Sequence, residues 1–273
     1  MSAPMLITFG SVKSSPGATT WALALAARWS QPGLAPLVVE LDFAGGDLGS
    51  RWHIHDEPGL AGLVLGARYS PLSDGSEFAQ RLPVGVDVVV APPGDAAAVT
   101  VAEFGTRGPA VLRELAATRP VFADLGRLDS QSPLLSYLDK ADELQLVTRP
   151  VAEQLRHLRA RVPHLVRRCA SVRLVLAGEG PYRPDEIATY LDLPVVAVVP
   201  FDPTGAAILA GRKRQAMGWT RRPLLAAMLL SVVSAGLSLA QPVVVGRLIS
   251  AVGDGAAVAT SVWLLLALLV ASA

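Results

Sequence analysis

The chain has almost no cysteine and almost no net charge. Cys169 is the one cysteine among 273 residues, so an intrachain disulfide is excluded, and no Cys/His cluster has the spacing of metal ligands. Lys and Arg number 24 against 23 Asp and Glu, which gives a net charge of +1 and excludes bulk electrostatic attraction to nucleic acid. No basic segment precedes an apolar core at the N-terminus, so no secretory signal is predicted. These features are typical of a protein in a reducing cytoplasm.

Charge is also missing from two long stretches near the end of the chain. Residues 223–246 and 255–273 contain no charged side chain, and each is long enough to cross about 30 Å of hydrocarbon as a helix. We therefore expect a two-helix transmembrane hairpin over 223–273; a pair of buried core helices is the alternative. A basic linker at 214–222 precedes it. The basic side chains that favour a cytoplasmic location for residues 1–213 are Arg212, Lys213, Arg214, Arg221 and Arg222.

Residues 1–213 alternate between short apolar runs and helical patterns. The expected strands are Met5–Phe9, Leu37–Leu41, Val86–Ala91, Val121–Ala123, Leu144–Thr148, Arg173–Ala177 and Val195–Val199. The expected helices are Thr19–Trp29, Pro109–Thr118, Val151–Val166, Pro184–Leu191 and Pro203–Leu209. Continuous apolar runs are typical of parallel strands that are covered on both faces. The order predicts a doubly wound α/β domain with a mostly parallel sheet, of the P-loop NTPase type.

A stretch like a phosphate-binding loop follows the first expected strand. It reads Lys13, Ser14, Ser15, Pro16, Gly17, Ala18, Thr19 and Thr20, and it leads directly into the first expected helix. Strand, loop and helix in this order form the context in which such a loop binds phosphate. Two acids, Asp42 and Asp124, are expected at the ends of other strands, where carboxylates can hold Mg²⁺ directly or through water. The alternative for each acid is a cap that accepts backbone hydrogen bonds.

These motifs together resemble the MinD/ParA family of deviant Walker-A ATPases, whose loop reads Lys-Gly-Gly-x-Gly-Lys-Thr-Thr. The resemblance covers about residues 3–213, and Gly46-Asp47-Leu48 is closest to the CpaE/TadZ-like branch. It implies ATP or ADP with Mg²⁺ as cofactors and a homodimer across the nucleotide site. It also implies that Lys13 reaches the partner's nucleotide, that Thr19 and Asp124 hold the metal, and that Asp42 serves the metal and orients the attacking water. Glu40 stands where the family often has Asp.

The loop departs from that pattern at the position of its second lysine. Ala18 occupies this position, which removes charge-assisted hydrogen bonds to the phosphates that are each worth roughly 1.5–3 kcal/mol. Ser14 and Ser15 replace glycines, so a loop position with positive φ would be strained. We expect weak nucleotide binding with little or no hydrolysis. A nucleotide-free pseudo-ATPase scaffold is the alternative, and a basic side chain from elsewhere in the fold is what would compensate for Ala18.

The C-terminal part resembles a different family. Residues 217–273, with Gln241-Pro242 and Gly246-Arg247, resemble the start of an ABC exporter transmembrane domain, but the chain has no ABC signature and no second phosphate loop. Two hypotheses follow. One is a membrane-tethered organiser of partitioning or secretion in the inner membrane. The other is a truncated or fused ABC transporter component.

Nucleic acid is not among the expected partners. Five arginines lie in or near the helix expected at 151–166, but they do not share one helix face and indicate a solvated surface. They are Arg156, Arg159, Arg161, Arg167 and Arg168.

Overall fold

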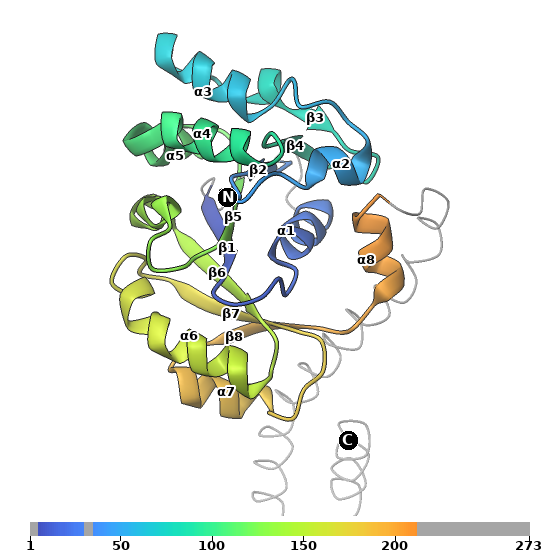
Figure 1. Cartoon of the computed structure of the whole chain (residues 1–273), viewed down its shortest axis with the longest axis vertical. Coiled ribbons are helices and arrows are strands. Elements are labelled where there is room, and N and C mark those ends of the chain that lie inside the picture. Colours follow the sequence, from blue (N-terminus) through green and yellow to red (C-terminus); the bar gives the residue numbers. More distant parts are fainter. Residues whose placement is uncertain (1–4, 30–34, 212–273) are drawn as a thin grey trace, which may run out of the picture. The chain divides into compact units, whose positions relative to one another are not determined.

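One sheet of eight strands forms the centre of the computed structural model, which describes residues 5–29 and 35–211 (Figure 1). The strand order is β3-β4-β2-β5-β1-β6-β7-β8, and within the described residues every neighbouring pair is parallel except β3 and β4. The strands are β1 (Leu6–Ser11), β2 (Leu37–Glu40), β3 (Gln80–Arg81), β4 (Asp87–Val89), β5 (Val121–Arg127), β6 (Glu143–Thr148), β7 (Val172–Ala177) and β8 (Val195–Val199).

Helices cover both faces of this sheet. The helices are α1 (Ala18–Ala27), α2 (Leu48–Trp52), α3 (Leu60–Tyr69), α4 (Asp95–Phe104), α5 (Gly108–Leu115), α6 (Ala152–Leu165), α7 (Pro184–Leu191) and α8 (Pro203–Leu209). Three short 3₁₀ turns complete the described elements: Ser76–Phe78, Gly105–Arg107 and Pro133–Lys140.

Successive residues of a central strand enter two different cores. Leu6 and Val39 pack with α3 to α7, whereas Ile7 and Val38 pack with α1 and α2 on the opposite face. Because both faces are covered, every residue of β1 is buried, and the strand does not alternate between buried and exposed positions. The predicted doubly wound, mostly parallel α/β fold is confirmed for the described residues.

Several elements have other bounds than the sequence predicted, and some elements of the structure were not predicted at all. β5 continues to Arg127, so Asp124 lies inside this strand and not at its end as the sequence suggested. The sequence analysis did not anticipate α2, α3, α4 or β3. Helix α3 contains Gly62 and Gly66, which are poor helix formers, but a side chain at Gly66 would collide with the Phe78 ring. Close packing against Phe78 therefore explains why Gly66 stands in this helix although glycine weakens helices.

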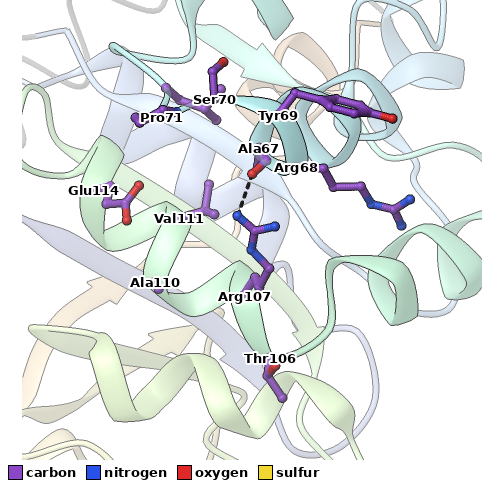
Figure 2. A pocket seen from close by; sticks show the side chains of 11 residues that line it. Ala67, Arg68, Tyr69, Ser70, Pro71, Thr106, Arg107, Ala110, Val111 and Glu114 are labelled. Carbon is purple, nitrogen blue, oxygen red and sulfur yellow. Dashed lines mark hydrogen bonds between the residues drawn. The ribbon is translucent and has the colours of Figure 1, made fainter.

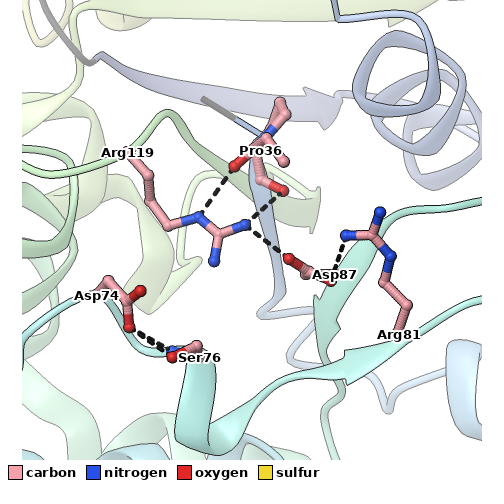
Figure 3. A network of polar contacts seen from close by, with 7 residues as sticks. Pro36, Asp74, Ser76, Arg81, Asp87 and Arg119 are labelled. Atoms are coloured by element: carbon pink, nitrogen blue, oxygen red, sulfur yellow. Dashed lines mark hydrogen bonds and ion pairs between the residues drawn. The ribbon is translucent and has the colours of Figure 1, made fainter. Parts of the chain in front are cut away.

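A polar network fixes the edge of the sheet where β2, β4 and β5 begin (Figure 3). Arg119 donates hydrogen bonds to the carbonyl oxygens of Ala35 and Pro36, and its guanidinium lies 2.8 Å from the Asp87 carboxylate. Arg81 pairs with the other oxygen of Asp87, also at 2.8 Å. The two arginines hold the pKa of Asp87 below its usual value against the opposing effect of burial. This network stabilises the edge opposite to the one that carries the predicted site.

The predicted linker at 214–222 and the predicted transmembrane hairpin at 223–273 lie outside the described residues. Within the described ranges, no helix combines the length and apolarity that crossing a bilayer requires.

Candidate functional site

The predicted phosphate loop connects β1 to α1 at the carboxyl edge of the sheet. Ser14 and Gly17 both have positive φ, 62° and 102°, and Gly17 caps α1. Ser14 therefore adopts the strained conformation that the sequence anticipated, whereas Ser15 does not. Within the described part of the chain, the N–H groups of Ser14, Ser15 and Gly17 donate no backbone hydrogen bond. A turn with free N–H groups before a helix N-terminus is a concavity suited to an anion.

Asp124 lies beside this loop, deep in the sheet. Its Oδ1 accepts a hydrogen bond from the Gly126 N–H at 3.1 Å, while its Oδ2 is buried without a partner in the described structure. Burial raises the pKa of Asp124 to about 6, and the nearby Thr19 hydroxyl and the Gly126 N–H oppose that shift. The Thr19 side chain thus lies next to the carboxylate with which the sequence paired it.

Asp42 follows β2 and packs against Gly126. A side chain at Gly126, which has a φ of 58°, would collide with the Asp42 carboxyl. Asp42 accepts a hydrogen bond from the Ala44 N–H at 2.9 Å. Burial raises the pKa of Asp42 above its usual value, and the Arg127 guanidinium opposes this shift. Asp42, just after β2, and Arg127, at the end of β5, therefore line the same cavity.

Glu40 has a role that the sequence analysis did not predict. It is buried, it lies directly beside Asp124 in the register of β2 and β5, and its carboxyl accepts three backbone hydrogen bonds. The donors are Asp47 (2.8 Å), Leu48 (3.1 Å) and Ala91 (3.1 Å). Burial raises the pKa of Glu40 to about 7, with the Asp124 charge adding to the rise against those hydrogen bonds. Glu40 thus ties the start of α2 and the segment after β4 to the end of β2.

One cavity of about 600 Å³ joins these features. The predicted site residues from Ser14 to Thr20 line it together with Asp42. The residues that line it without having been predicted are Ser11, Phe43, Ala44, Asp47, Arg51, Gly126, Arg127, Asp129, Gln131, Ser132 and Pro133. No local pattern of the sequence singles out Arg127, although it stands only three residues after Asp124.

Lys13 and Asp124 do not line the cavity, although both were predicted as site residues. Asp124 is buried beneath it, whereas the Lys13 side chain is exposed. An exposed lysine at the rim has the freedom to point away from its own loop.

The chemistry of the acids fits a hydrated Mg²⁺ ion. Asp124 has a buried oxygen without a partner, Thr19 supplies a hydroxyl beside it, and Asp42 lies at the same edge. Within the described residues no group of three His, Cys, Asp or Glu side chains is placed to hold a metal. Mg²⁺ is usually bound by one or two carboxylates with water and substrate phosphates, so such a group is not required here.

A second cavity, of about 400 Å³, lies between the end of α3 and α5 (Figure 2). Arg107 donates a hydrogen bond of 2.9 Å to the Ala67 carbonyl at its wall. None of the predicted site residues lines this cavity.

Comparisons with known proteins agree with the fold. No family model matches the chain, and no curated protein matches its sequence. A ParA family ATPase from Chlorobium tepidum has a similar structure, with a TM-score of 0.63 at 20% identity over 77% of this chain and 90% of that one.

Two MinD structures are also similar. The cell division ATPase MinD of Pyrococcus furiosus has a TM-score of 0.62 at 17% identity, over 78% of this chain and 92% of that one. The septum site-determining protein MinD of Pyrococcus horikoshii, complexed with Mg-ADP, has a TM-score of 0.60 at 18% identity, over 76% and 91%. At these identities the likeness concerns the fold. The described part of this chain has the fold of the MinD and ParA P-loop ATPases.

Proposed function

We propose that the chain binds a nucleoside diphosphate or triphosphate with Mg²⁺, hydrolyses it slowly or not at all, and acts as a membrane-tethered organiser of partitioning or secretion. The carrying observation is the single cavity in which the loop from Ser14 to Thr20 meets Asp42, with Asp124 buried beneath it. The Mg-ADP bound to the similar MinD of Pyrococcus horikoshii supports a nucleotide as the ligand.

Slow hydrolysis follows from the missing loop lysine. Phosphoryl transfer depends on neutralising charge around the γ-phosphate, and Ala18 offers no charge there. Asp42 lies where it could orient a water, but orientation alone leaves the developing negative charge uncompensated. Binding without efficient turnover is therefore the expected behaviour.

The test is calorimetric titration of the full-length chain in detergent with Mg·ADP and Mg·ATP at low salt. Micromolar affinity that disappears when Mg²⁺ is chelated supports the proposal. We expect Thr19→Ala to weaken Mg-dependent binding by about tenfold, because it removes a metal ligand beside Asp124. Thr189→Ala on α7, where the hydroxyl bonds only its own helix, is the matched control.

A nucleotide-free scaffold is the second candidate, and the charge of the cavity favours it. Three carboxylates line the cavity, from Asp42, Asp47 and Asp129, against the two guanidiniums of Arg51 and Arg127. No binding at millimolar nucleotide, together with binding by an Ala18→Lys variant, would establish this candidate.

The proposal includes a homodimer across the nucleotide site with Lys13 facing the partner's phosphates. Lys13 is exposed and does not line its own cavity, which supports a role outside its own loop. Lys13→Ala should abolish ATP-dependent dimerisation in analytical ultracentrifugation while leaving the affinity of the monomer for ADP within about twofold. A variant that dimerises as the parent does would contradict this part of the proposal.

A further inference from the structure

We propose that Arg127 supplies the positive charge that Ala18 lacks, so that the diphosphate group of the ligand is held from the end of β5 as well as from the loop. The inference rests on the proposed nucleotide site and names the side chain that makes it work. The chemical class of the ligand is an anion with two or more linked phosphates, bound together with Mg²⁺.

The backbone around Arg127 is fixed from both sides. Arg127 is paired with Ser11, the last residue of β1 before the loop, in the sheet register. The next residue, Leu128, donates its N–H to the Ser11 carbonyl at 2.8 Å and is buried. The preceding residue, Gly126, packs against the Asp42 carboxyl. The Arg127 side chain therefore leaves a rigid strand end at the rim of the cavity, next to the start of the loop.

Two arginines line this cavity, and within the described residues Arg127 is the one without an ion pair. Arg51, the other arginine in the wall, forms an ion pair of 2.6 Å with Asp47. Arg127 forms no ion pair within the described residues, and its side chain is exposed although it lines the cavity. Lys13 lies outside the wall. Among the cations of the described structure, Arg127 thus combines position with freedom to bind a ligand.

A guanidinium is well suited to this task. It stays protonated at any physiological pH and presents paired N–H donors that match two phosphate oxygens. Its side chain is longer than that of the loop lysine it would replace, and it starts from the strand paired with β1. With three carboxylates in the same wall, one arginine does not balance the charge of a diphosphate, so we expect binding to require Mg²⁺ as well.

Neutralising Asp42 is the competing role for Arg127. In that role the guanidinium would hold the carboxylate in place and touch no ligand. A lysine at position 18 distinguishes the two roles. It could replace a phosphate contact made by Arg127, but it could not replace a contact between Arg127 and Asp42.

The experiment is a double-mutant cycle on the full-length chain in detergent, with the affinity for Mg·ADP measured by calorimetry. Arg127→Gln should weaken binding by about tenfold or more, and Arg127→Lys by less, because the charge remains. Ala18→Lys should restore the affinity of Arg127→Gln, so that the loss caused by Arg127→Gln falls below about threefold in the Ala18→Lys background. Arg167→Gln, an exposed arginine just after α6, is the matched control and should bind as the parent does. Thermal unfolding of each variant confirms that it is folded.

The outcomes separate the inference from the function on which it rests. If the parent binds Mg·ADP and Arg127→Gln binds equally well, the inference fails and the nucleotide site stands. If Arg127→Gln causes the same loss with and without the lysine at position 18, Arg127 acts through Asp42 and the inference again fails. If the parent binds nothing while Ala18→Lys does, both the inference and the proposed function are overturned.

Discussion

At position 124 a carboxylate is buried with one oxygen bonded and the other without a partner in the described structure. Burial raises its pKa from an ordinary 3.8 to about 6. A raised pKa means that the folded state binds a proton more tightly than the unfolded state does. The contribution of the protonated Asp124 carboxyl to the free energy of unfolding is therefore complete below about pH 4. It is lost as the pH rises towards 6. Above that pH the folded domain carries the full cost of a buried charge.

Asp124→Asn should remove this cost. We expect the variant to be more stable than the parent at pH 8, on the order of 2 kcal/mol in free energy of unfolding, with a smaller difference at pH 5. The measurement is urea unfolding of both proteins at the two pH values. Mg-dependent nucleotide binding should disappear in the same variant. A stability difference that is equal at pH 5 and pH 8 would show that Asp124 is not the titrating group.

Gly126 is a second residue whose surroundings in the site leave no room for a side chain. It has positive φ, and an added Cβ would collide with the Asp42 carboxyl. Gly178 has a φ of 77° with no heavy atom within 4 Å of an added Cβ, so Gly178→Ala carries the backbone strain without the collision. We expect Gly126→Ala to cost about 1–2 kcal/mol more than Gly178→Ala in unfolding free energy. Only Gly126→Ala should weaken Mg·ADP binding, because it displaces Asp42. Equal losses in both variants would exclude the collision as the cause.

At the scale of elements, Glu40 determines how the segment after β2 is held. Its carboxyl accepts backbone hydrogen bonds from the start of α2 and from Ala91 beyond β4. In Glu40→Gln one of these N–H groups would face an amide NH₂, which cannot accept its proton. A buried donor left unpaired costs about 1–3 kcal/mol.

Hydrogen exchange followed by mass spectrometry can localise this loss. Peptides that cover 44–52 and 89–94 should exchange faster in Glu40→Gln, while peptides from α6 should not change. Glu103→Gln, an exposed acid on α4, is the control and should exchange as the parent does. Faster exchange throughout the domain would instead indicate general destabilisation.

The sequence predicted the elements that local pattern determines and missed those that packing determines. Leu37, Val38 and Val39 of β2 form a continuous apolar run because this strand is covered on both faces, so the sequence alone locates it. β3 has two residues and exists through its pairing with β4, which no local pattern encodes. The end of β5 was set too early, because Asp124 is polar and a buried carboxylate inside a strand is unusual.

At the scale of the molecule, the site depends on which strand ends meet. β2 and β5 are far apart in the chain but adjacent in the sheet, so Asp42 and Arg127 line the same cavity. The loop from Ser14 to Thr20 and its acids were predictable because each has a recognisable local context. Arg127 was not, since an arginine at a strand end has no pattern of its own until the strand order places it next to Ser11.

The proposed membrane tether also concerns the whole molecule, and it is argued from the distribution of charge along the chain. In residues 1–213 charged side chains occur throughout, whereas 223–246 and 255–273 have none. An uncharged stretch of this length is favourable in hydrocarbon, and basic residues just before it favour retention of that end in the cytoplasm. We therefore expect the full-length chain to resist extraction of membranes with alkaline carbonate, while a chain ending at residue 213 is released.

Orientation gives the sharper test of the same prediction. In a hairpin the short connection from Arg247 to Asp254 lies across the membrane from residues 1–213. A cysteine introduced at Ser250, in a Cys169→Ser background, should react with a membrane-impermeant thiol reagent added to intact cells. One introduced at exposed Ser50, in the same background, should react only after the cells are opened. Labelling of both positions only in opened cells would rule out the hairpin and leave 223–273 as a buried helical pair or a peripheral segment.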